Sequence, residues 1–165
     1  MKASPAVAVS FHRDSSLPPQ HPPMDEKALV LVVDDEASSR EPLVFMLQGE
    51  GYRTSTASNG RAALAAIARQ APDLILLDVT MPGMDGYELA TLLKANPSTA
   101  TIPIVMVTGF TGRAARVVGL NAGAEDILSK PVDSAELALK VRNLLRLRMN
   151  ALAQPIAPAL HAPRP

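Results

Sequence analysis

Cysteine is absent from this chain of 165 residues. A disulfide framework, a thiolate zinc site and a cysteine nucleophile are therefore excluded. Tryptophan is also absent, and aromatic residues make up only 3% of the chain. The 16 basic residues balance the 16 acidic ones, so the chain has no net charge. A neutral chain has no overall attraction for nucleic acid or an anionic membrane, and we expect neither as a direct partner.

Long apolar segments are missing as well. No run approaches the ~18 to 20 residues that a membrane-spanning helix needs. The segment from Met1 to Ser10 lacks a long apolar core behind a basic start, so it does not resemble a secretory signal. We expect a soluble, cytoplasmic protein.

Proline is concentrated at the two ends of the chain. Nine of the 15 prolines lie within residues 1–24 and 151–165. Segments of this composition bury too little apolar surface to offset an ordering entropy of about 1 to 2 kcal/mol per residue. We therefore predict disordered tails at 1–24 and at 151–165, the second rich in Ala and Pro. One folded domain is expected over residues 25–150.

Apolar runs and helical patterns alternate along this domain. Continuous apolar runs predict buried parallel strands at 28–33, 74–77, 102–107 and 127–128, and a Thr- and Ser-containing segment predicts an edge strand at 52–57. Helical spacing predicts further helices at 61–70, 87–95, 113–122 and 134–152. The first helix is expected to begin near Ser38 or Ser39, with Ser38 and Glu41 as a capping box and Pro42 in its opening turn. Five βα units predict an α/β fold with a parallel sheet, whose ligands bind at the carboxyl ends of the strands.

Acidic residues follow two of the predicted strands. Asp34, Asp35 and Glu36 come directly after the first strand, and Asp78 ends the third. If these strands are neighbours, each pair of carboxylates at ~4 Å repels by about 4 kcal/mol at an effective dielectric constant near 20. A hard divalent cation would relieve this repulsion, and oxygen ligands favour Mg²⁺ over Zn²⁺. Alternatively, the acidic pair only stabilises the N-terminus of the following helix.

A hydroxyl and an ammonium group are expected at the same edge of the sheet. Thr108 ends the fourth strand, and Lys130 follows the fifth. Alone, a threonine at a strand end is usually structural and a lysine is usually a solvated charge. Together with the carboxylates they form a set suited to a phosphoryl group and Mg²⁺.

Four segments in this order resemble the receiver domain of bacterial two-component response regulators. They are LVVDDE at 31–36, LLDVTMPGMDG at 76–86, VTG at 107–109 and GAEDILSKP at 123–131. The resemblance extends over most of residues 27–148. It implies a flavodoxin-like, doubly wound (βα)5 fold with strand order 2-1-3-4-5.

The resemblance also implies a role for each residue of the motifs. Asp78 would be the phosphoacceptor, taking a phosphoryl group from a histidine kinase or a histidine phosphotransfer protein. The resemblance implies Mg²⁺ as cofactor, held by Asp34, Asp35, Asp78 and the backbone carbonyl of Thr80. Such domains regulate rather than catalyse, apart from their own phosphorylation and dephosphorylation.

The remaining motif residues would act on the attached phosphoryl group. Lys130 would neutralise its oxygens, and Thr108 would hydrogen-bond to it as the switch residue. The Lys130–Pro131 peptide bond would be cis. A downstream protein effector would bind near the fourth helix and fifth strand, and a homodimer would use the face between the fourth and fifth helices.

The switch position is where this sequence departs from the family. Ile127 replaces the usual Tyr or Phe, so an aromatic ring cannot rotate inward when Thr108 moves. This motivates an alternative, in which the domain is a phosphate sink or scaffold. A further alternative is a Mg²⁺ phosphatase using an aspartyl phosphate, although Val79 and Thr80 follow Asp78 where such enzymes carry a second acid. The histidines, His12, His21 and His161, all fall in the predicted tails.

Overall fold

The apolar runs of the sequence form one parallel sheet in the computed structural model, which describes residues 27–154. Five strands lie in the order β2-β1-β3-β4-β5, with every pair of neighbours parallel. The strands are β1 (Leu29–Val33), β2 (Arg53–Ala57), β3 (Leu74–Asp78), β4 (Ile104–Thr108) and β5 (Asp126–Ser129). The predicted α/β fold and strand order are therefore confirmed, with the Thr- and Ser-containing strand β2 at an edge.

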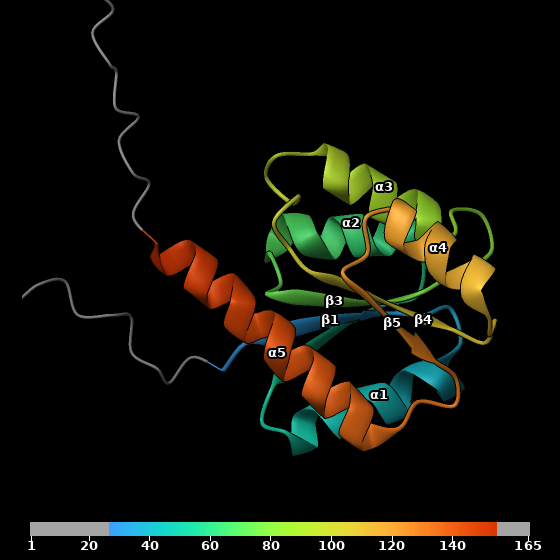
Figure 1. Ribbon diagram of the computed structural model, residues 1–165, viewed down its shortest axis with the longest axis horizontal. Coiled ribbons are helices and arrows are strands. Elements are labelled where there is room, and N and C mark those ends of the chain that lie inside the picture. The colour runs from blue at the N-terminus through green and yellow to red at the C-terminus, as the bar shows by residue number, and fades with distance from the viewer. Residues whose placement is uncertain (1–26, 155–165) are drawn as a thin grey trace, which may run out of the picture.

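Five helices cover the two faces of the sheet (Figure 1). They are α1 (Ala37–Gly49), α2 (Gly60–Arg69), α3 (Gly86–Ala95), α4 (Arg113–Asn121) and α5 (Ser134–Ala153). One apolar cluster joins the sheet to α1 and α5, and a second joins it to α2 and α3. Alternate residues of β1 enter the two clusters, because successive side chains of a strand point to opposite faces. This explains why the central strands are apolar throughout.

The start of α1 differs from the prediction. The helix begins at Ala37 after Glu36, and no side chain caps its N-terminus. The expected capping box of Ser38 and Glu41 is therefore wrong, and Pro42 lies inside the helix rather than in its opening turn. The spacing of a capping box cannot fix where a helix starts when the preceding strand determines where the chain turns.

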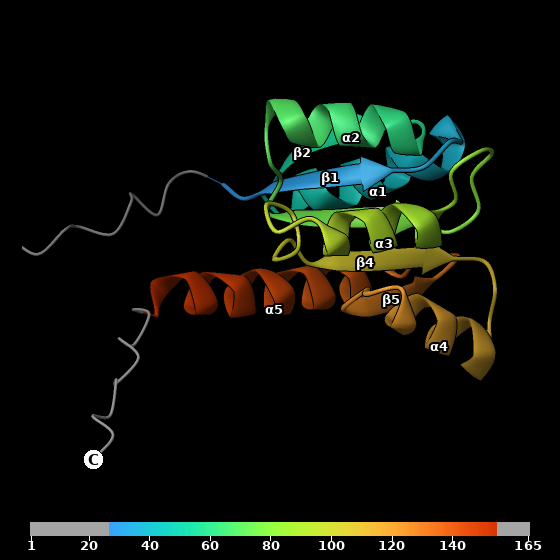
Figure 2. The same cartoon turned by 90° about the horizontal axis from the view of Figure 1, so that it is seen from above.

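The C-terminal helix extends past the sheet. Figure 2 shows α5 running beyond the ends of the strands. It ends at Ala153, so the boundary predicted at residue 150 lies inside this helix. The rest of the predicted tails, and the three histidines, lie outside the described residues. Among residues 27–154, no helix is long and apolar enough to cross a membrane.

Candidate functional site

Three carboxylates meet at the carboxyl ends of the central strands. Asp34 follows β1 directly, and Asp78 is the last residue of β3. Because β1 and β3 are paired neighbours, with Val33 beside Leu77, the residues that follow them lie together. Asp34, Asp35 and Asp78 each offer an oxygen within 4.8 Å of the others. The convergence expected from the sequence is present.

Lys130 bridges two of these carboxylates from the loop after β5. Its Nζ lies 3.1 Å from Asp78 Oδ1 and 3.2 Å from Asp34 Oδ2. The peptide bond that follows it, Lys130–Pro131, is cis. Three carboxylates and one ammonium leave a formal charge of −2 at the site. A charge of this size matches a divalent cation.

Burial and charge shift the ionisation of the central pair. Burial raises the pKa of Asp78 above its usual value, and the negative charges of Asp34 and Asp35 add to this, while Lys130 opposes it. Burial alone would lower the pKa of Lys130, but its hydrogen bonds to Asp78 and Asp34 and their charges raise it instead. Lys130 is thus held protonated beside Asp78, and it only partly offsets the effects that raise the pKa of that carboxyl group.

The donor set fits Mg²⁺. Carboxylate oxygens are the ligands that this ion selects, and the described residues offer no cysteine sulfur or imidazole nitrogen at the cluster. Asp34 is only 1% exposed, whereas Asp35 is partly exposed and lines the pocket in front of Asp78. Thr80 lines the same pocket. Asp35 is therefore the carboxylate most open to an incoming ion.

This pocket forms the approach to Asp78. Its walls come from the loops that follow β1, β3, β4 and β5, and its lining residues are Asp35, Glu36, Asp78, Thr80, Met81, Pro82, Gly109, Phe110 and Lys130. Phe110 is 60% exposed at its rim. Asp78 is thus reached from solvent through a pocket that has both polar and apolar walls.

Thr108 lies at the back of the site rather than in the pocket wall. It is 3% exposed, and its Oγ1 accepts a hydrogen bond of 3.0 Å from the amide of Phe110. Its carbonyl accepts a hydrogen bond from the amide of Lys130 at 2.8 Å. The expected neighbourhood of Thr108 and Lys130 is present, and the hydroxyl is engaged by its own loop.

Gly86 packs against the backbone of Asp78. A Cβ at this position would lie 2.9 Å from Val79 Cα and closer still to the Asp78 carbonyl oxygen. The Gly86 amide also donates to the Val79 carbonyl at 2.9 Å. The last glycine of the MPGMDG segment is thus required by close packing against the backbone of Asp78 and Val79, a role that sequence reasoning left unassigned.

Helix α4 covers Ile127, the residue at the switch position. Ile127 is 9% exposed on β5 and packs beneath Gly119 of α4, together with Met106 of β4. An aliphatic side chain therefore occupies the space between α4 and the sheet. The contact with Gly119 has no local signal in the sequence, because it joins residues from different elements.

Comparison with known proteins identifies the family and the fold. The family model of the response regulator receiver domain matches residues 30–142. The response regulator PleD of Caulobacter vibrioides is 47% identical over 122 residues, covering 74% of this chain and 27% of PleD. The DNA-binding response regulator MtrA of Mycobacterium tuberculosis is 43% identical over 117 residues, covering 71% of this chain and 50% of MtrA. This chain thus spans half or less of the length of these relatives.

Solved structures agree. A putative response regulator from Chloroflexus aurantiacus superposes with a TM-score of 0.71 at 38% identity, covering 73% of this chain and 98% of that one. The chemotaxis protein CheY4 of Vibrio cholerae gives a TM-score of 0.68 at 34% identity, covering 72% and 98%. The chain therefore belongs to the response regulator receiver domain family of two-component signalling.

Proposed function

We propose that this domain is a phosphoacceptor that receives a phosphoryl group on Asp78 with the help of Mg²⁺. The observation that carries the proposal is the cluster at the strand ends. Asp34, Asp35 and Asp78 lie within 4.8 Å of one another, and Lys130 contacts two of them. Asp34, Asp35, Asp78 and the Thr80 carbonyl would hold the ion. When bound, Mg²⁺ would neutralise charge on the phosphoryl oxygens.

The reaction needs a nucleophile in line with the donor and little else. A carboxylate oxygen of Asp78 attacks phosphorus, the P–N bond of a phosphohistidine breaks, and the imidazole leaves with the electron pair of that bond. Lys130 stays protonated and stabilises the negative charge on the phosphoryl oxygens. No general base is required, because the attacking group is already a carboxylate.

Thr108 would respond to the attached phosphoryl group. Its hydroxyl oxygen accepts from Phe110 in the present state, so the hydroxyl hydrogen is free to donate to a phosphoryl oxygen. Such a bond would draw the loop between β4 and α4 toward Asp78. Ile127 lies under that helix, so movement of α4 rather than rotation of a ring would report phosphorylation.

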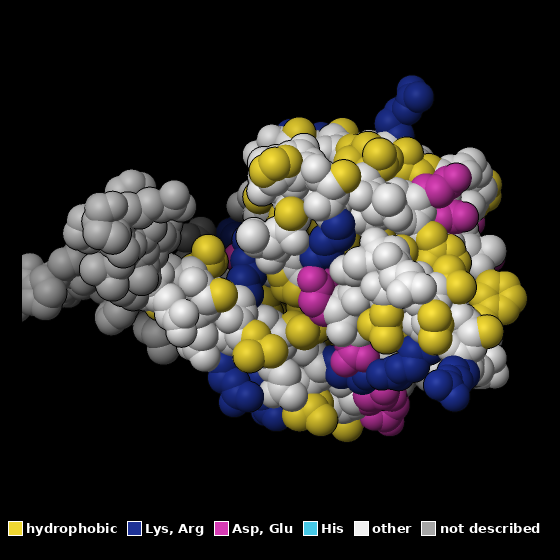
Figure 3. Space-filling view, turned by 45° about the horizontal axis from the view of Figure 1, so that its top comes forward, with side chains coloured by type: hydrophobic (Ala, Val, Ile, Leu, Met, Phe, Trp, Pro, Cys, Tyr) yellow, Lys and Arg dark blue, Asp and Glu magenta, His cyan; other side chains and the backbone are white. Residues whose placement is uncertain are grey.

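The phosphoryl donor and the downstream target would both be proteins. We expect a sensor histidine kinase or histidine phosphotransfer protein as donor, in the cytoplasm, and a protein effector as target. The exposed apolar residues Val117, Val118 and Leu120 of α4 offer a binding surface next to β5. Figure 3 shows that apolar side chains reach the surface in several separate places among charged ones. A homodimer through the α4 to α5 face would use the same surface.

A phosphate sink is a second candidate, favoured by Ile127. If α4 does not move, phosphorylation would change the charge at Asp78 and nothing at the effector surface. Amide NMR spectra with and without beryllofluoride, which mimics a phosphoryl group, separate the two. Shifts along α4 support signalling, whereas shifts confined to the site support a sink.

Phosphorylation itself is tested with a small donor. The chain is incubated with acetyl phosphate and Mg²⁺, and its intact mass is measured. We expect one added phosphoryl group, sensitive to acid and base. Asp78→Asn should gain none, while the control Asp85→Asn should behave as the unsubstituted chain, because Asn also caps α3 well. Undiminished labelling of Asp78→Asn would reject the assignment.

A further inference from the structure

Every polar atom of Asp34 has a partner. Its amide donates to the Ala57 carbonyl at 3.1 Å, and its Oδ1 accepts from the Glu36 amide at 2.9 Å. Its Oδ2 faces Lys130 at 3.2 Å, and its backbone carbonyl accepts from Arg40 Nη1 at 2.7 Å. The contact with Arg40 is the shortest of the four. This buried residue is therefore held from both its backbone and its side chain.

Arg40 connects the start of α1 to the end of β1. The N-terminus of α1 has no side-chain cap, so the helix is not fixed there in the usual way. Arg40 instead reaches back from α1 to the residue that follows the strand. A guanidinium donating to a carbonyl forms a strong, directional bond. Residues 35–39 lie between Asp34 and Arg40, so the bond closes the loop that carries Asp35.

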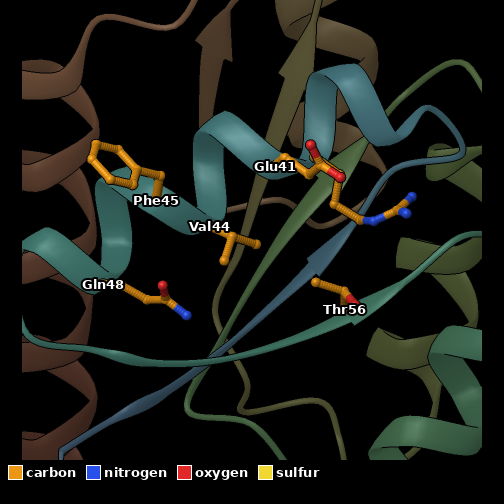
Figure 4. Close-up of a pocket in the computed structure, with 6 residues that line it drawn as sticks. Glu41, Val44, Phe45, Gln48 and Thr56 are labelled. Atoms are coloured by element: carbon orange, nitrogen blue, oxygen red, sulfur yellow. The ribbon is translucent and has the colours of Figure 1, made fainter.

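Arg40 does not reach the reacting groups. It lines a different pocket, between α1 and β2, with Glu41, Val44, Phe45, Gln48 and Thr56. Figure 4 shows Val44 and Gln48 of α1 directed toward the strands in this pocket, with Thr56 of β2 opposite. Arg40 is absent from the residues that line the approach to Asp78. Any effect on that site must therefore pass through Asp34 and its loop.

We propose that Arg40 is a positioning residue for the metal site, holding the loop from Asp34 to Glu36 so that the carboxylates converge. The proposal rests on the proposed function, since it assigns Arg40 to the same site. Groups that orient metal ligands without touching the ion typically change affinity by about 10- to 100-fold.

The charge of Arg40 and its hydrogen bond to Asp34 would change the affinity for a divalent ion in opposite directions. A positive charge close to Asp34 repels a cation, so removal of that charge alone would tighten binding of a divalent ion. Loss of the bond to Asp34 would instead free the loop and weaken binding. The direction of the change therefore distinguishes the two roles.

Binding of Mn²⁺, used as a probe of the Mg²⁺ site, is measured by the EPR signal of the free ion. The variants are Arg40→Met, which removes the donor and keeps the length, and Arg40→Lys, which keeps the charge and a donor. Arg69→Met on the exposed end of α2 is the control with the same change in net charge. Amide exchange of each variant reports whether the fold and the Glu36 amide remain protected.

We expect Arg40→Met to weaken Mn²⁺ binding by about tenfold, with partial recovery in Arg40→Lys and no change in Arg69→Met. The Glu36 amide should lose protection while β1 keeps it. Unchanged or tighter binding in Arg40→Met would overturn the proposal, as would equal loss of protection throughout the domain. If the unsubstituted chain bound no Mn²⁺, the proposed function would fail as well.

Discussion

Gly119 of α4 lies directly over Ile127 of β5. A Cβ at residue 119 would lie 2.9 Å from Ile127 Cδ1 and 3.3 Å from Met106 Sδ. The helix can approach the sheet this closely only because residue 119 has no side chain. The position of α4 is thus tied to the side chain at the switch position, and movement of one requires a change at the other.

Gly119→Ala should destabilise the domain by about 1 to 3 kcal/mol, because the added methyl group overpacks this contact. Gly49→Ala is the matched control: nothing lies within 4 Å of its Cβ position, and it is also helical. It should stabilise by up to about 1 kcal/mol through helix propensity. Urea unfolding measures both. In Ile127→Val, which lacks Cδ1, the cost of Gly119→Ala should fall, and an unchanged cost would contradict the contact.

Gly86→Ala should distort the end of β3 and impair phosphorylation of Asp78. The methyl group would press on the Asp78 and Val79 backbone, at a cost of about 1 to 3 kcal/mol in stability. We expect acetyl phosphate to label this variant at least about tenfold more slowly, since small displacements of reacting groups are costly. Gly109→Ala, which has open space at the same site, is the control. Equal labelling rates for the two variants would refute this role for Gly86.

Asp78→Asn should stabilise the domain at neutral pH when divalent cations are removed. The pKa of Asp78 is raised in the folded state, chiefly by burial, so the folded state binds this proton more tightly than the unfolded one. Stability therefore falls as pH rises from the unfolded pKa of about 3.9 through the raised value. Thermal unfolding in EDTA should show an advantage for Asp78→Asn that grows across this range. An advantage that shrinks as pH rises would contradict the sign.

Lys94→Met should destabilise the domain by about 2 kcal/mol without affecting the site. Lys94 Nζ donates to the carbonyls of Ala100 and Ile102 and to Glu125 Oε1. These groups lie at the amino ends of β4 and β5, whereas the site lies at the carboxyl ends of the strands. Glu125 in turn accepts from the Ile104 amide at 2.6 Å. Urea unfolding and acetyl phosphate labelling check the two halves of this statement. A large loss of labelling in folded Lys94→Met would contradict this prediction, because it would show that the two ends of the strands are coupled.

The three central strands, β1, β3 and β4, were predictable because they are buried on both faces. A continuous apolar run such as Leu74–Leu77 is typical of a buried parallel strand. The same reasoning predicted that the carboxylates converge with Thr108 and Lys130, because the carboxyl ends of parallel strands lie at one end of the sheet. Strand ends were placed within two residues, as for Ile102 against the observed start at Ile104.

The remaining features depend on contacts between distant parts of the chain. Helix α1 begins without a side-chain cap, and Arg40 of its first turns bonds back to Asp34. Gly119 over Ile127 joins a helix to a strand. Neither leaves a periodic or local pattern in the sequence, because each depends on side-chain geometry after the sheet has formed.

The most direct test of the central claim is to map the phosphorylated residue. The chain is treated with acetyl phosphate and Mg²⁺, reduced with borohydride, which converts an aspartyl phosphate to homoserine, and digested for mass spectrometry. We predict homoserine at residue 78 and at no other aspartate, with Asp34 and Asp35 intact. Homoserine at residue 34 or 35, or at none of the three, would contradict the assignment of Asp78 as the phosphoacceptor.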